Sequence, residues 1–254
     1  MGVSPELKAE VISSLCGEPV KLYDSRTFQG RVPPQKLSVD DFLLRTILGN
    51  QETYRELFLD VENFFDPDYD YDFTNLSDSD LLCKRGDEYY ERPKGWYRMA
   101  LKVRGKYPDG DDWLGPDGWR RHSVPGEWPV SYHGTSIDGA KGIIKEWYKA
   151  GDRDQYGRGV YSTPDIHVAD YFATTFSSPT TGKCYKVIMQ NRINGDKREK
   201  CDEPDYWLIP VESGTPPDEE KSIVERSIRP YGILIKEIRD EGTPAHQDSF
   251  CTII

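Results

Sequence analysis

The chain has 254 residues, with 33 Lys and Arg against 44 Asp and Glu, and a formal net charge of −11. Nucleic-acid backbones are bound by clustered cations, so we expect no nucleic-acid partner for so acidic a chain. Hydrophobic residues make up only 36% of the chain. No apolar run approaches the roughly 18 residues of a transmembrane helix, and we expect no secretory signal at the N-terminus.

Candidate metal sites are not evident in the sequence. The five cysteines form no Cys-x-x-Cys pair, which argues against a zinc site and is typical of free thiols in a reducing compartment. The alternating aspartates of Asp66–Phe73 resemble a calcium loop, but neither possible register has Gly at the sixth position or Glu at the twelfth. We therefore expect no metal and a cytoplasmic location.

The first 88 residues divide by charge. Val39–Phe58 has the apolar spacing of a helix, preceded by Ser38 as a start signal, so a helical region is expected over 1–60. From Glu56 to Cys83 there are nine acidic residues and no Lys or Arg. This pattern predicts a solvated acidic linker over 61–88.

A mixed domain is expected over 89–240, followed by a flexible tail over 241–254. A helix is predicted to open at Thr163, with Thr163 as N-cap and Pro164 at the first position. Strands and helices that follow one another without regular βαβ alternation predict an α+β fold. The strands are expected at Pro129–Gly134, Cys184–Gln190, Asp205–Val211 and Tyr231–Ile238, and a further helix at Asp138–Lys149.

Three short motifs stand in the expected domain. Residues 133–135 read His-Gly-Thr at the end of a predicted strand, and residues 157–161 read Gly-Arg-Gly-Val-Tyr. Ala169-Asp170-Tyr171 lies in the helix that follows. Dinucleotide-fold, P-loop, nucleophile-elbow and zincin motifs are missing from the sequence.

The order of these motifs resembles the catalytic domain of ADP-ribosyltransferases of the poly(ADP-ribose) polymerase type, over roughly residues 129–238. The resemblance implies two small, mainly antiparallel sheets flanked by helices, and NAD as substrate. It also implies that His133 bonds an NAD ribose hydroxyl, Gly134 pairs with the nicotinamide carboxamide, and Tyr171 stacks on the nicotinamide ring. The remaining NAD contacts would come from Thr135, Arg158, Gly159 and Tyr161, with Arg158 as a candidate for phosphate. The resemblance also implies that His133 and Tyr161 are catalytic residues, together with a carboxylate.

The catalytic carboxylate departs from the family's pattern. Members that transfer ADP-ribose carry Glu directly before a Tyr-aliphatic strand, whereas the matching residue here is Asp205. Aspartate is one methylene shorter, so Glu203 and Glu212 remain alternatives. The resemblance therefore implies mono-ADP-ribosyl transfer to a protein acceptor, or NAD hydrolysis, rather than polymer synthesis.

Three other functions stay open. The domain could bind NAD or ADP-ribose without turnover. A related RNA 2′-phosphotransferase is disfavoured by Tyr161 and by the net charge of −11. The tryptophan-rich and acidic first half could also serve as a protein-binding platform beside a vestigial pocket.

The last four residues, Cys251-Thr252-Ile253-Ile254, fit the Cys-aliphatic-aliphatic-X signal for prenylation, with loose tolerance for threonine. Cys251 is therefore a candidate lipidation site and the expected route to a membrane. No polybasic stretch or adjacent second cysteine supplies the second signal that stable anchoring needs.

Overall fold

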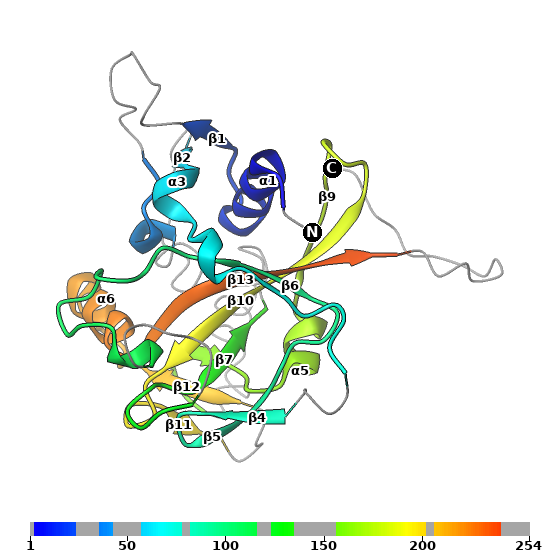
Figure 1. The fold of residues 1–254 in the computed structure, drawn as a ribbon. Coiled ribbons are helices and arrows are strands. Elements are labelled where there is room, and N and C mark those ends of the chain that lie inside the picture. Colours follow the sequence, from blue (N-terminus) through cyan, green and yellow to red (C-terminus); the bar gives the residue numbers. More distant parts are fainter. Residues whose placement is uncertain are drawn as a thin grey trace.

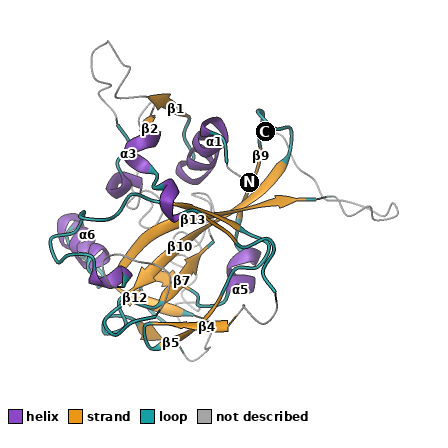
Figure 2. Ribbon diagram, viewed as in Figure 1, coloured by secondary structure: helices purple, strands orange, loops and turns teal. Residues whose placement is uncertain are grey.

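A computed structural model of the chain describes residues 3–23, 36–42, 57–77, 82–115, 123–134, 156–201 and 206–239. Within these residues the fold is α+β, with small sheets and short helices (Figure 2). Every described strand pair is antiparallel except β1 (Val20–Tyr23) with β2 (Leu57–Asp60), which is parallel. The predicted α+β class is confirmed at this level.

Two long strands cross the middle of the molecule, β10 (Cys184–Ile193) and β13 (Ile228–Ile238) (Figure 1). The neighbours Val187 and Ile188 both have 0% exposure, so both faces of β10 are covered, because successive strand residues point to opposite faces. The sheet order is β3-β6-β13-β10-β7, and β9 also pairs with β10. The remaining strands of this sheet are β3 (Tyr71–Asp72), β6 (Tyr97–Ala100), β7 (Val130–His133) and β9 (Thr174–Ser177).

A second sheet lies against the edge of the first at β7. It contains β8 (Gly159–Ser162), β12 (Trp207–Pro210) and β11 (Glu199–Lys200), with β12 in the middle. Strand β7 meets this sheet through an isolated bridge, in which Tyr132 N donates to Thr163 O at 2.7 Å and Thr163 N donates back at 3.0 Å. A separate hairpin pairs β4 (Leu82–Arg85) with β5 (Glu88–Glu91).

The described helices are short and lie around the sheets. Helix α1 (Pro5–Cys16) begins at Ser4, whose Oγ accepts from Leu7 N at 3.2 Å, and ends at Gly17 with φ of 67°. Glu10 accepts a hydrogen bond from Thr180 Oγ1 at 2.6 Å, which holds α1 beside the loop after β9 (Figure 1). The others are α3 (Val61–Phe64), α5 (Ile166–Tyr171) and α6 (Pro217–Glu225), with 3-10 turns at Pro67–Tyr69 and Asp112–Leu114.

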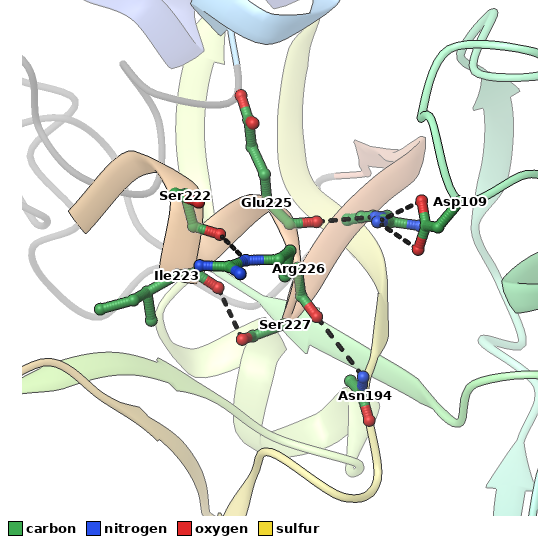
Figure 3. Close-up of polar contacts among 8 residues, drawn as sticks. Asp109, Asn194, Ser222, Ile223, Glu225, Arg226 and Ser227 are labelled. Atoms are coloured by element: carbon green, nitrogen blue, oxygen red, sulfur yellow. Dashed lines mark hydrogen bonds and ion pairs between the residues drawn. The ribbon is translucent and has the colours of Figure 1, made fainter. Parts of the chain in front are cut away.

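The joint between α6 and β13 is closed by side chains that bond the backbone (Figure 3). Ser227 Oγ donates to Ile223 O at 2.6 Å, and Asn194 Nδ2 donates to Arg226 O at 3.4 Å. Arg229 is 1% exposed and donates through Nη2 to both carboxylate oxygens of Asp109 at 2.9 Å. The guanidinium also lies over the Tyr107, Trp113 and Trp128 rings.

The N-terminal region is not simply helical. Residues 39–42 are helical, and Asp41 N donates to Ser38 Oγ at 3.1 Å, as expected for the start of the predicted helix. Its predicted end is wrong, because Leu57 and Phe58 belong to β2, where they pair with Val20 and Lys21. A helical region over 1–60 is therefore not confirmed.

The expected acidic linker over 61–88 contains packed structure. Phe64, Phe65 and Phe73 are at most 3% exposed and belong to the hydrophobic core. Asp70 accepts a hydrogen bond from Ala100 N at 2.7 Å, which fixes the segment against β6. Burial of three aromatic side chains stabilises this packing despite the surrounding charge, so the expectation of a solvated linker is corrected here.

Four predicted strands are present as β7, β10, β12 and β13, with ends that differ by a few residues. The helix after β8 begins two residues later than predicted. Asp165 is the N-cap of α5 and its Oδ1 accepts from His167 N at 2.7 Å, whereas Thr163 Oγ1 accepts from Asp165 N. The predicted helix at 138–149 lies outside the described residues.

Candidate functional site

The first two sequence motifs meet where β7 ends beside β8. His133 is the last residue of β7, and its Nδ1 lies 2.8 Å from the backbone oxygen of Tyr161 in β8, 28 positions along the chain. The neighbouring backbone bridge between Tyr132 and Thr163 holds the two strands at this point. The imidazole is thus positioned by the strand that carries the Gly-Arg-Gly-Val-Tyr motif.

The contact with a carbonyl oxygen sets the protonation of the ring. A carbonyl can only accept, so Nδ1 carries the proton and donates to Tyr161 O. Burial lowers the pKa of His133 below its ordinary value, against a smaller opposing effect of this hydrogen bond. In the resulting neutral ring, Nε2 has the lone pair of an acceptor.

The lowered pKa of His133 predicts a pH-dependent stability. The unfolded chain takes up this proton near pH 6.5, before the folded chain does, so the free energy of unfolding should fall as the pH drops below about 6.5. The slope from this group cannot exceed about 1.4 kcal/mol per pH unit, the value for a difference of one bound proton. Urea unfolding between about pH 5 and 7 should show it in the wild type and not in His133→Gln. Equal slopes in the two proteins would contradict the prediction.

Tyr161 contributes its backbone to His133 and its side chain to the glycine-rich turn. The phenol donates to Gly157 O at 2.6 Å, which closes the turn before β8. Gly157 has a φ of 91°, a conformation that favours glycine. A Cβ at Gly159 would lie 2.1 Å from Ile209 O, so glycine is needed there for β8 and β12 to pair closely.

Helix α5 lies directly against Gly134. A Cβ on Gly134 would lie 2.3 Å from the backbone oxygen of Ala169, so a side chain at this position would displace the helix. The helix ends at Tyr171, whose side chain is 85% exposed and meets Phe172 edge-on with ring centroids 5.0 Å apart. The third motif is therefore fixed beside the first, with an aromatic ring open to solvent.

A cluster that the motifs did not reveal anchors α5 to the central sheet. Lys186 of β10 and Lys236 of β13 are directly paired across the strands, and their Nζ atoms lie 2.7 and 2.6 Å from the Asp170 carboxylate. Burial alone would raise the pKa of Asp170, but the hydrogen bonds of the two lysines outweigh it and lower the pKa. The only available sequence signal was Asp170 itself, in the Ala-Asp-Tyr motif.

Arg158 faces protein groups in this structure. Its guanidinium donates to Val211 O at 3.2 Å and Glu212 O at 2.8 Å, and it bonds both oxygens of Glu220 at 3.0 and 2.9 Å. These contacts tie the glycine-rich turn to α6. Glu212 is exposed and follows β12, and its backbone oxygen takes part in this contact.

Several predicted site residues lie outside the described residues. These are Thr135, both carboxylates at 203 and 205, and Cys251. The structure thus brings together His133, Gly134, Tyr161 and the helix that carries Tyr171, and the predicted catalytic Asp205 remains a prediction.

One group near α5 has the composition of a cation site. Ligand atoms of Glu91, Asp165 and His167 lie within 4.8 Å of one another. His167 is 77% exposed in its side chain, and Asp165 already accepts the N-cap hydrogen bond of α5. The carboxylates of Glu91 and Asp165 are partly exposed, and acidic groups at a surface commonly lie together without a metal, so the group supports no metal role.

Comparison with models of known protein families and with curated proteins finds no match to this chain. Among the described helices, none combines the length and apolar character needed to cross a membrane.

Proposed function

We propose that the chain is an NAD-dependent ADP-ribosyltransferase that transfers one ADP-ribose unit and releases nicotinamide. The observation that carries the proposal is the 2.8 Å contact between His133 Nδ1 and Tyr161 O. It joins the His-Gly-Thr and Gly-Arg-Gly-Val-Tyr motifs, which the sequence likens to the two strands of the family's NAD pocket. Neither motif alone would be specific.

The backbone direction near Gly134 supports the placement of nicotinamide. Alternate residues of a strand direct their N–H and C=O groups to the same edge. Tyr132 uses these groups on Thr163, directly after β8, so those of Gly134 are expected at the same edge, beyond the isolated bridge. A carboxamide placed there would lie near α5, whose exposed Tyr171 offers a ring for stacking.

The neutral His133 suits the proposed role. With the proton on Nδ1, Nε2 accepts a hydrogen bond from a ribose hydroxyl. The nicotinamide–ribose bond breaks with its electron pair going to nicotinamide, and a carboxylate at Asp205, or at Glu203 or Glu212, stabilises the positive charge on the ribose. The acceptor then bonds the ribose carbon and loses a proton, which balances the reaction.

We further propose a protein acceptor, in keeping with the acidic chain and the absence of a basic nucleic-acid motif in its sequence. We propose a cytoplasmic location from the five cysteines, which form no Cys-x-x-Cys pair. Prenylation at Cys251 would be the route to a membrane surface. The chemistry assigned to this site requires no metal, and NAD serves as substrate.

The test is nicotinamide release from NAD by the purified chain. We expect release by the wild type, a loss of about 100-fold or more in His133→Ala, and a comparable loss in Asp205→Ala. His167→Ala is the matched control, since that imidazole is 77% exposed, and it should retain the wild-type rate.

The other outcomes are equally informative. Release that survives Asp205→Ala would move the carboxylate to Glu203 or Glu212. Absence of release, with NAD still raising the melting temperature of the wild type and not of His133→Ala, would reject the enzyme in favour of an NAD- or ADP-ribose-binding module. Absence of both release and binding would reject the NAD site.

A further inference from the structure

A cavity of about 350 Å³ lies on the other side of the sheet from His133. Tyr132, the neighbour of His133 in β7, donates its hydroxyl hydrogen bond to Glu91 O, next to Tyr90 in the cavity wall. Adjacent strand residues point to opposite faces, so the cavity and His133 are separated by the sheet. The volume falls within the range of small-molecule sites, about 300 to 1,000 Å³.

The walls of the cavity combine three arginines with aromatic rings and with two carboxylates, those of Asp68 and Asp70. Aromatic side chains come from the segment before β6 and from β5 and β13, and they include Tyr71, Phe73 and Tyr231. The cations are Arg85 at the end of β4, Arg92 after β5 and Arg98 in β6. Four separate stretches of chain thus contribute to one concave surface.

Arg98 is the unusual member of this set. It is 7% exposed, and its Nε is buried without a hydrogen-bond partner. Its Nη2 donates to Tyr69 O at 3.0 Å, and its Nη1 lies 3.5 Å from Gln190 Oε1. No carboxylate among the described residues forms an ion pair with it. Both partners that it has are neutral.

The adjacent strand leaves room for the Arg98 side chain. A Cβ on Gly232, in the adjacent strand, would lie 2.7 Å from Arg98 Cδ, so glycine leaves the space in which the side chain lies. The guanidinium carbon lies 5.5 Å from the Tyr231 ring centroid, 5.6 Å from that of Phe73 and 5.9 Å from that of Tyr71. Aromatic faces offset only part of the cost of burying a charge.

Two other buried arginines show what Arg98 lacks. Arg192 lies 3.2 Å from Glu127, and Arg229 lies 2.9 Å from Asp109. The aspartates near Arg98 do not supply a counterion: Asp68 is exposed, and Asp70 is bonded to Ala100 N and lies 3.8 Å from Lys8. An anion from outside the chain would compensate the charge of Arg98.

We propose that this cavity binds a small phosphomonoester with a flat aromatic body, of the size of a nucleoside monophosphate. The guanidinium of Arg98 suits a phosphate because its donors form a planar fork, and Arg92 adds a second cation. The aromatic walls accept the flat base by stacking. This site is independent of the NAD pocket and of whether the chain cleaves NAD.

The experiment is calorimetric titration of the full chain with AMP, adenosine and inorganic phosphate. AMP should bind saturably. Adenosine lacks the phosphate group and inorganic phosphate lacks the flat base, so each should bind at least about tenfold more weakly than AMP. Two substitutions should each weaken AMP binding at least about tenfold. They are Arg98→Met, which keeps much of the aliphatic packing, and Arg92→Gln, at a half-exposed position. Arg226→Gln, outside the cavity, and His133→Ala should leave the affinity unchanged.

A second measurement separates binding from structure. Without ligand, Arg98→Met should melt at the wild-type temperature or higher, because it removes an uncompensated buried charge, and AMP should no longer raise its melting temperature. The proposal is overturned if AMP does not bind the wild type, if Arg98→Met retains the affinity, or if His133→Ala abolishes binding and so assigns AMP to the NAD pocket. If inorganic phosphate binds as tightly as AMP, the claim that the aromatic walls recognise a flat base is overturned. If Arg98→Met does not fold, an unchanged AMP affinity in Arg92→Gln is the outcome that rejects the site.

Discussion

Replacing Glu127 with alanine should destabilise the chain by about 3 to 5 kcal/mol, because it leaves a buried arginine without its counterion. The side chains of Arg192 and Glu127 are 1% and 0% exposed, and Nη1 lies 3.2 Å from Oε2. Glu127 Oε1 also accepts from Gly86 N at 3.0 Å. The substitution thus leaves both the Arg192 guanidinium and the Gly86 N–H without the carboxylate that they contact. Urea unfolding at pH 7 measures the loss.

The double variant Glu127→Met with Arg192→Met controls for the loss of charge compensation. Removing both partners leaves no unpaired charge, so this variant should be more stable than Glu127→Ala, despite two substitutions in the core. Arg192 also lies over the Tyr231 ring, 5.2 Å from its centroid, and methionine retains part of that packing. If the double variant is less stable than Glu127→Ala, the Glu127–Arg192 ion pair makes a net stabilising contribution. The loss in Glu127→Ala would then not be explained by the cost of leaving Arg192 unpaired.

The elements that sequence reasoning predicted are those with strong local signals. Strands β10 and β13 each contain a short apolar run, at 187–189 and 233–235, and both faces of the strands are covered there, so burial and local propensity agree. The glycine-rich turn before β8 could also be predicted from the sequence. The structure shows why glycine stands there: Gly157 has a positive φ, and Gly159 allows close strand pairing. In each case the determining residues are neighbours in sequence.

The errors occur where partners are distant in sequence. Leu57 and Phe58 have the spacing of a helix, yet β1 provides a parallel strand 37 positions earlier and they pair with it. The acidic stretch over 61–88 has no clear helix or strand pattern in its sequence. Phe64 and Phe65 nevertheless pack in a hydrophobic core that other segments of the chain form. Net charge predicts solvation on average, whereas a few large aromatic residues decide whether a segment packs.

The two candidate sites differ in the same way. The contact of His133 with Tyr161 joins motifs that can be recognised as short strings of residues. The cavity around Arg98 depends on residues from 68 to 231, none of which forms a motif with its sequence neighbours. Gly232 makes room for Arg98 because β6 and β13 pair, and these two strands are distant in sequence.

Replacing Gly134 with alanine should lower both stability and nicotinamide release. The added Cβ would lie 2.3 Å from Ala169 O and 3.2 Å from the carbonyl carbon of Phe172. These are backbone atoms, so no side-chain rotation relieves the overlap and α5 must move as a unit. We expect a destabilisation of about 1 to 3 kcal/mol, the usual range for overpacking. Displacing Tyr171 by about 1 Å would also slow nicotinamide release by about 100-fold under the proposed function.

Gly195→Ala is the matched control, because a Cβ there meets only Arg198 Nη1, at 3.9 Å. It adds the same methyl group, so it corrects for the change that alanine makes in the unfolded chain. Gly134→Ala as stable as Gly195→Ala would refute the close approach of α5. A destabilised Gly134→Ala with normal nicotinamide release would separate the two roles: the helix would pack as described, and the ring of Tyr171 would have no part in holding nicotinamide.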